Sequence, residues 1–190
     1  MSGTNFSEIT WTFLDVETTG LDPSLGERIC EVSILRCRNG EVLEKFQSLI
    51  DPRKTISPEA QAVNGITPEM LQGKPSFSET APKILSMIQD SVIVCHNAPF
   101  DIGFLKTEFG RLGQSLPPLT VVDTLKLARK HFRYAKNSLG YLARELGVPS
   151  EGWHRAENDT MILKNVFDLF MKELSRRGPL ELEELVSENV

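Results

Sequence analysis

Five residues of this sequence have types and spacing that suit metal-assisted chemistry on phosphate esters. They are Asp15, Glu17, Asp101, His154 and Asp159. Carboxylates gathered from distant segments repel one another, and one of them would be forced to keep its proton unless a cation cancelled the charge. Magnesium and manganese are hard cations that prefer carboxylate oxygen as a ligand. The four acids therefore predict a site for two divalent metal ions, Mg²⁺ or Mn²⁺.

The acids and the histidine lie in three short stretches, residues 13–21, 96–104 and 154–159. In residue identity and order, these stretches resemble the DEDDh family of 3′-to-5′ exonucleases, and within it the proofreading epsilon subunits of bacterial DNA polymerase III. Asp-x-Glu alone is common, but all three stretches in this order are specific. The resemblance covers the chain from about Thr10 to about Phe170. It implies an enzyme that removes nucleoside 5′-monophosphates from DNA 3′ ends in proofreading or repair.

The same resemblance implies a role for each of the five residues. Asp15 is expected to bridge the two metal ions, and Glu17 and Asp159 to complete the ion on the side of the attacking water. Asp101 is expected to support the second ion, directly or through water. His154 would be the general base, because the ordinary pKa of histidine, about 6.5, lies close to working pH.

Residues that bind the substrate are also implied by the resemblance. One set follows the first two acids and would contact the terminal nucleotide: Thr18, Thr19, Gly20 and Leu21. A second set comes from two later segments: Asn64, Ile66, His96, Asn97 and Phe100. Asn64 stands where proofreading relatives usually have histidine, so a sugar or base contact there would differ. For Phe100 we favour packing over stacking on a base, and for Asp123 we favour a helix cap.

The distribution of charge favours a nucleic-acid partner although the net charge is −5. Residues 124–144 contain no aspartate or glutamate. A basic patch of this kind can hold a phosphate backbone. The alternative is a solvated basic face without a ligand. The cations that we expect to bind the backbone are Lys126, Arg129, Lys130, Arg133 and Lys136.

The composition is that of one soluble globular domain, with 190 residues of which 40% are hydrophobic and 25% charged. We expect an exonuclease domain over residues 1–175 and an acidic C-terminal tail over residues 176–190. No apolar run approaches the roughly 20 residues that a membrane helix needs, and the N-terminus lacks a signal-peptide pattern. A cytoplasmic protein with no membrane partner is expected. The three cysteines are expected to be reduced thiols in the core.

The elements that must position the acids can be predicted from periodicity. Apolar residues alternate over 9–14, so Asp15 and Glu17 share a side at the end of a strand. Asn39-Gly40 predicts a hairpin between strands at 28–36 and 41–50. Two short strands are expected at 91–95 and 120–122, with helices around 81–88, 99–112, 125–132, 139–146 and 161–170. This order predicts an α/β fold whose mixed five-stranded sheet is an antiparallel meander followed by parallel strands, flanked by helices. The resemblance sharpens this to a ribonuclease H-like fold.

Three functions are compatible with these observations. The first is hydrolysis of single-stranded or frayed DNA 3′ ends, with a DNA polymerase subunit as a possible partner. The second is RNA trimming of the oligoribonuclease or ribonuclease T type, because selectivity for the 2′-hydroxyl cannot be read from the sequence. The third is an inactive module that docks on a polymerase. Such modules usually lose an acid or the histidine, and this chain retains all five residues.

Overall fold

A computed structural model describes residues 4–149 and 156–187. Five strands form one sheet in the order β3-β2-β1-β4-β5. The strands are β1 (Thr10–Thr18), β2 (Ile29–Arg38), β3 (Glu41–Leu49), β4 (Val92–Cys95) and β5 (Thr120–Asp123). The first three strands pair antiparallel, and β4 and β5 run parallel to β1. The predicted mixed sheet is confirmed.

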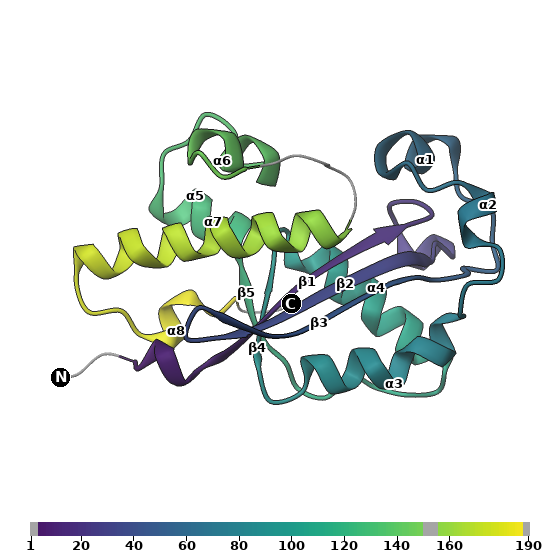
Figure 1. Cartoon of the computed structure of the whole chain (residues 1–190), viewed down its shortest axis with the longest axis horizontal. Helices are drawn as coiled ribbons and strands as arrows, with labels where there is room; N and C mark the ends of the chain where they lie inside the picture. The colour runs from purple at the N-terminus through teal and green to yellow at the C-terminus, as the bar shows by residue number, and fades with distance from the viewer. Residues whose placement is uncertain (1–3, 150–155, 188–190) are drawn as a thin grey trace.

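Helices cover both faces of this sheet (Figure 1). One face packs against α3 (Phe77–Ile88) and α4 (Ala98–Arg111). The other packs against α5 (Thr124–His131), α6 (Leu139–Glu145) and α7 (Ala156–Arg177). The remaining short helices are η1 (Phe6–Glu8), η2 (Pro23–Leu25), α1 (Pro58–Asn64), α2 (Pro68–Leu71) and α8 (Leu182–Leu185). Of these, α1 and α2 lie beyond the end of β1 (Figure 1).

The side chains of β1 alternate between the two faces of the sheet, and both faces are buried under helices. Neighbouring strand residues point to opposite faces. Phe13, which is 1% exposed, packs edge-on against Phe167 of α7, with 5.7 Å between ring centroids. Its neighbour Leu14 is fully buried in the cluster formed with α3 and α4. A nearly continuous apolar strand with helices on both sides is the expected result.

The turn between β2 and β3 fixes the register of the antiparallel strands. Asn39 and Gly40 both have positive φ, 50° and 80°, as a two-residue hairpin with the favoured twist requires. The predicted hairpin is confirmed. In the separate pairing of β1 with β2, Asp15 lies opposite Ser33 and Glu17 lies opposite Glu31.

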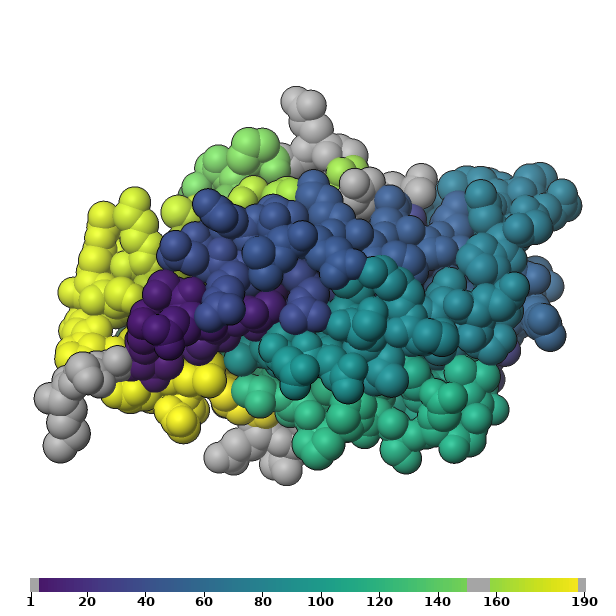
Figure 2. Space-filling view, turned by 60° about the horizontal axis from the view of Figure 1, so that its bottom comes forward, coloured from purple at the N-terminus to yellow at the C-terminus, as the bar shows by residue number. Residues whose placement is uncertain are grey.

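Two segments differ from the predicted elements. Helix α7 runs over Ala156–Arg177, well beyond the expected 161–170, and packs along β1 and β2. After α7 the chain returns to the sheet, where Leu185 is 2% exposed and the Ser187 N–H donates to the Val121 carbonyl at 2.8 Å. Part of the acidic segment therefore packs against the domain, next to the N-terminal segment (Figure 2). Within the described residues, no helix is both long and apolar enough to cross a membrane.

Candidate active site

Three carboxylates meet at the end of β1, and we call Asp15, Glu17 and Asp159 the carboxylate cluster. Each offers an oxygen, and these atoms all lie within 4.8 Å of one another. Asp15 and Glu17 share one side of β1 because strand side chains repeat with period two. Asp159 comes from the first turns of α7, whose N-terminal end lies near the end of β1 (Figure 1). Oxygen-only donors at this spacing fit a hard divalent cation.

Asp101 lies beside the carboxylate cluster, on the first turn of α4. Its side chain is 3% exposed, and Oδ1 accepts a hydrogen bond from the Val16 N–H at 3.1 Å. This bond ties the N-terminus of α4 to β1. The structure therefore brings all four predicted acids to one end of the sheet, with three in direct proximity and Asp101 next to them.

The electrostatics of the site favour bound cations. Burial raises the pKa of Asp15 well above its ordinary range, and the negative charges of Asp101, Glu17, Asp159 and Glu31 raise it further. Burial also raises the pKa of Asp101. Without a counter-charge, these groups ionise at a cost to folding. Divalent cations would remove that cost, so the residues fit the two metal ions that the sequence predicts.

A fifth acid, Glu31, was missed by the sequence analysis. It is fully buried on β2, and it is the Cα partner of Glu17 across the strand pair. Its Oε1 accepts a hydrogen bond from the Gln47 amide at 2.8 Å. No local pattern in the sequence indicates it, because Glu31 meets Glu17 only through the pairing of β1 with β2.

Replacing Glu31 by glutamine should weaken metal binding. The substitution keeps the shape of the side chain but removes a negative charge next to the carboxylate cluster. Residues around a metal site change metal affinity by about 10- to 100-fold when mutated, so we expect a loss of about tenfold in Mn²⁺ affinity, measured by titration calorimetry. Glu41→Gln, at an exposed position of β3, is the control. Equal affinities in wild type and Glu31→Gln would contradict this role.

The segment after the first two acids is held mainly by internal hydrogen bonds. The Thr18 hydroxyl donates to the Gly20 carbonyl at 2.6 Å, and the Thr19 hydroxyl donates to the Glu27 carboxylate. A Cβ on Gly20 would lie 2.7 Å from the Glu27 side chain, so a larger residue there would displace the Glu27 carboxylate. Leu21 is 87% exposed. Of the four predicted contacts, Leu21 is the side chain that presents an open apolar surface.

Asn64 and Ile66 face the interior of the protein. The Asn64 amide donates to the Thr18 carbonyl at 3.2 Å, and its oxygen accepts from the Ile66 N–H at 3.0 Å. Asn64 is 3% exposed and Ile66 is 0% exposed. These side chains hold α1 against the end of β1 instead of offering a surface to a nucleotide. The predicted direct contacts do not match this geometry.

The residues at the end of β4 differ in their surroundings. His96 contacts the Thr124 hydroxyl at 2.9 Å through Nδ1 and the Asn137 carbonyl at 2.8 Å through Nε2. Burial lowers the pKa of His96, so the ring is neutral. Because a carbonyl oxygen can only accept, Nε2 carries the proton and donates it to the Asn137 carbonyl. Asn97 is exposed, with φ of 73°. Phe100 packs on Phe104, with 4.9 Å between ring centroids, as predicted.

Asp123 is the N-cap of α5, and its Oδ1 accepts from the Leu125 N–H at 2.9 Å. The predicted cap is confirmed. The same oxygen accepts from the Asn97 N–H at 3.0 Å. Asp123 therefore joins the end of β4 to the start of α5. His154 lies outside the described residues, so its role as a general base stays a prediction.

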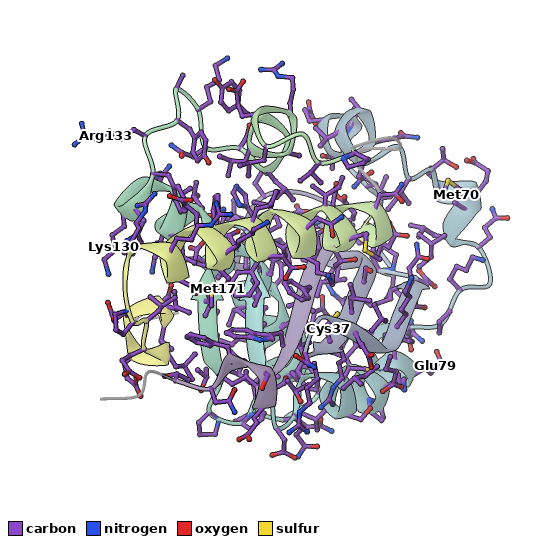
Figure 3. All side chains as sticks on the ribbon, turned by 60° about the vertical axis from the view of Figure 1, so that its left-hand side comes forward. Cys37, Met70, Glu79, Lys130, Arg133 and Met171 are labelled. Atoms are coloured by element: carbon purple, nitrogen blue, oxygen red, sulfur yellow. The ribbon has the colours of Figure 1, made fainter. Side chains whose placement is uncertain are left out.

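The five predicted basic residues are exposed. They lie on α5 and the segment after it. The His131 carbonyl accepts a hydrogen bond from Arg177, the last residue of α7, at 2.8 Å. Lys130 and Arg133 accordingly lie at the C-terminal end of α7 (Figure 3). They are placed for a distant part of a long substrate, not for its terminal nucleotide.

A mixed sheet with this strand order and carboxylate cluster defines a ribonuclease H-like nuclease. The family model for exonucleases, RNase_T, matches residues 12–167. The chain belongs to this exonuclease family. The predicted likeness to DEDDh exonucleases is confirmed.

The curated relatives are PolC-type DNA polymerase III enzymes of bacteria. The chain is 34% identical over 180 residues to the PolC-type DNA polymerase III of Thermotoga maritima, covering 95% of this chain and 13% of the relative. It is also 34% identical over 182 residues to the PolC-type enzyme of Staphylococcus epidermidis, covering 94% of this chain and 13% of the relative. The chain thus spans only about an eighth of these relatives.

Solved structures share the fold. Exonuclease X in complex with 5′ overhanging duplex DNA is 25% identical with a TM-score of 0.70, covering 87% of this chain and 93% of that one. The nuclease domain of 3′hExo bound to rAMP is 15% identical with a TM-score of 0.79 and full coverage of both chains. E. coli exonuclease I in complex with a dT13 oligonucleotide is 21% identical with a TM-score of 0.78, covering 89% and 42%.

Proposed function

We propose that this chain removes nucleotides from DNA 3′ ends, with two divalent metal ions, in proofreading or repair. The carboxylate cluster with Asp101 beside it carries this proposal. The likeness to exonuclease X, whose structure contains DNA with an overhang, supports a DNA substrate. The likeness to PolC-type polymerases supports a role beside a DNA polymerase.

The chain's own residues would divide the work. Asp15, Glu17 and Asp159 would hold the ion nearest the attacking water, and Asp101 the second ion. Two such ions, when bound, activate water and neutralise charge on the scissile phosphate and the leaving oxygen. His154 would accept the proton of the attacking water at a ring nitrogen. Exposed Leu21 would lie against the terminal base, a contact that tolerates any sequence.

Blocking the 3′ end should stop digestion. A single-stranded DNA labelled at its 5′ end, with a free 3′-hydroxyl, should shorten stepwise in Mg²⁺ and release nucleoside 5′-monophosphates. A bulky 3′ block should slow this by about 10²-fold, because the terminal nucleotide must be positioned at the metal ions. A paired 3′ end should be digested more slowly than a frayed one.

The control for this assay is the same strand blocked at its 5′ end, which should be digested normally. Resistance of the 5′-blocked strand, with digestion of the 3′-blocked one, would reverse the proposed direction. A matched RNA strand tests the second candidate, which the rAMP bound to 3′hExo favours. Faster digestion of RNA than DNA would replace DNA by RNA as the substrate.

A further inference from the structure

A groove of about 420 Å³ lies between α6 and the C-terminal half of α7. We call it the distal groove; it is lined by Phe132, Tyr134, Leu146, Leu169, Lys172 and Arg176, among others. Asp159 lies near the start of α7 and Arg177 is its last residue. At a rise of 1.5 Å per residue, their Cα atoms are about 27 Å apart. The distal groove is therefore separate from the carboxylate cluster.

Stacked aromatic rings form one side of the distal groove. The Phe132 ring stacks on Phe170, with 4.3 Å between centroids and 21° between planes. Tyr134 lies nearly parallel beside both rings, 5.8 Å from Phe132 and 6.4 Å from Phe170. Phe170 is fully buried, whereas Phe132 and Tyr134 are half-buried and line the groove. Phe132 is already covered by Phe170 and by the Arg177 guanidinium, so Tyr134 is the ring on which a planar ligand could stack at little cost in side-chain entropy.

Positive charge surrounds these rings. The Arg177 guanidinium lies 5.1 Å from the centroid of Phe132. Lys172 and Arg176 are exposed at the groove, and Glu173 is the one acid in its lining, 3.8 Å from Arg176 and 3.2 Å from Arg177. The groove thus has three cations and one carboxylate in a chain of net charge −5. Such a local excess attracts a polyanion.

We propose that the distal groove binds the upstream part of the single strand whose 3′ end is being digested. This inference rests on the proposed exonuclease function and adds a second binding site to it. Aromatic platforms with neighbouring cations bind single strands by stacking bases and neutralising phosphates. The lining residues of α7 begin at Leu169 and end at Arg177, about 15 to 27 Å along the helix from Asp159, which corresponds to about four to eight nucleotides at the 3.4 Å rise of a stacked strand. The exposed Lys130 and Arg133 extend the same basic surface (Figure 3).

Length dependence tests this site. We would compare steady-state digestion of dT20 and dT4 by wild type, Tyr134→Leu and Lys172→Gln/Arg176→Gln. Loss of one stacked base should raise the KM for dT20 by about tenfold in Tyr134→Leu. The double variant should raise the same KM by about tenfold and flatten its dependence on salt. For dT4, whose three stacked steps span about 10 Å and end short of the groove, KM and kcat should stay at wild-type values in both variants.

The control is Arg38→Gln/Lys74→Gln, which removes two exposed cations that are not in the lining of the distal groove. An equal rise of KM for dT4 and dT20, or an equal effect of the control, would overturn the proposal. So would an unchanged KM for dT20, as expected if the groove held a protein segment. A rise in the double variant alone would exclude base stacking and overturn it as well. If wild type digested neither strand, the proposed exonuclease function itself would fail.

Discussion

Replacing Asp15 by asparagine is expected to abolish digestion, a loss of about 10³-fold or more in kcat. Asp15 stands at the centre of the site: its oxygens lie within 4.8 Å of those of Glu17 and Asp159, and Asp101 acts on it electrostatically. Asparagine keeps the shape but cannot supply the charge that holds divalent ions. The measurement is single-turnover digestion of 5′-labelled DNA in Mg²⁺. Wild-type rates in Asp15→Asn, with contaminating nuclease excluded, would remove Asp15 from the mechanism.

The same variant should be more stable than wild type when metal is absent. The pKa of Asp15 is raised in the folded protein, mainly by burial. The folded state then holds the proton more tightly than the unfolded chain. The free energy of unfolding therefore falls as pH rises above about 4, the ordinary pKa of an aspartate. Asp15→Asn has no carboxyl group at this position, so its free energy of unfolding does not fall in this way as pH rises. Its Tm should therefore exceed that of wild type at neutral pH and equal it below pH 4.

Thermal unfolding in chelator at the two pH values measures this advantage. Asp22→Asn is the matched control, because Asp22 is exposed and hydrogen bonds to Ser24 lower its pKa. That variant should gain no stability at neutral pH. If Asp15→Asn lost stability instead, the lost activity could reflect a damaged fold, and its kinetics could not be assigned to the metal site.

Asp15 and Glu17 could be predicted as a pair from the local pattern, whereas Asp101 and Asp159 were expected from the resemblance to DEDDh exonucleases. An Asp-x-Glu pair at the end of a strand must share one side, and β1 shows this arrangement. The Asn39-Gly40 turn fixed the meander. In each case a strong local preference agrees with the tertiary structure.

Other parts of the site depend on contacts that no local pattern encodes. Glu31 joins the acids only through the register of two strands. Asn64 turns inward because the Thr18 carbonyl and the Ile66 N–H need partners at the end of β1. The distal groove likewise requires residues of α6, α7 and the segment after α5 to meet. Sequence suggested a basic stretch there, but not its distance from the acids.

Replacing His154 by alanine is expected to lower kcat by about 10²- to 10⁴-fold with little change in KM, as loss of a general base would. The variant should also lose the acid limb of the pH–rate profile, because histidine is the group that titrates between pH 5 and 8. His131→Gln is the control: it changes another of the chain's three histidines, at the far end of α7 from the acids. A normal kcat in His154→Ala would mean that the attacking water loses its proton without this side chain. The acids alone would then carry the reaction, and Asp15→Asn would remain the decisive variant.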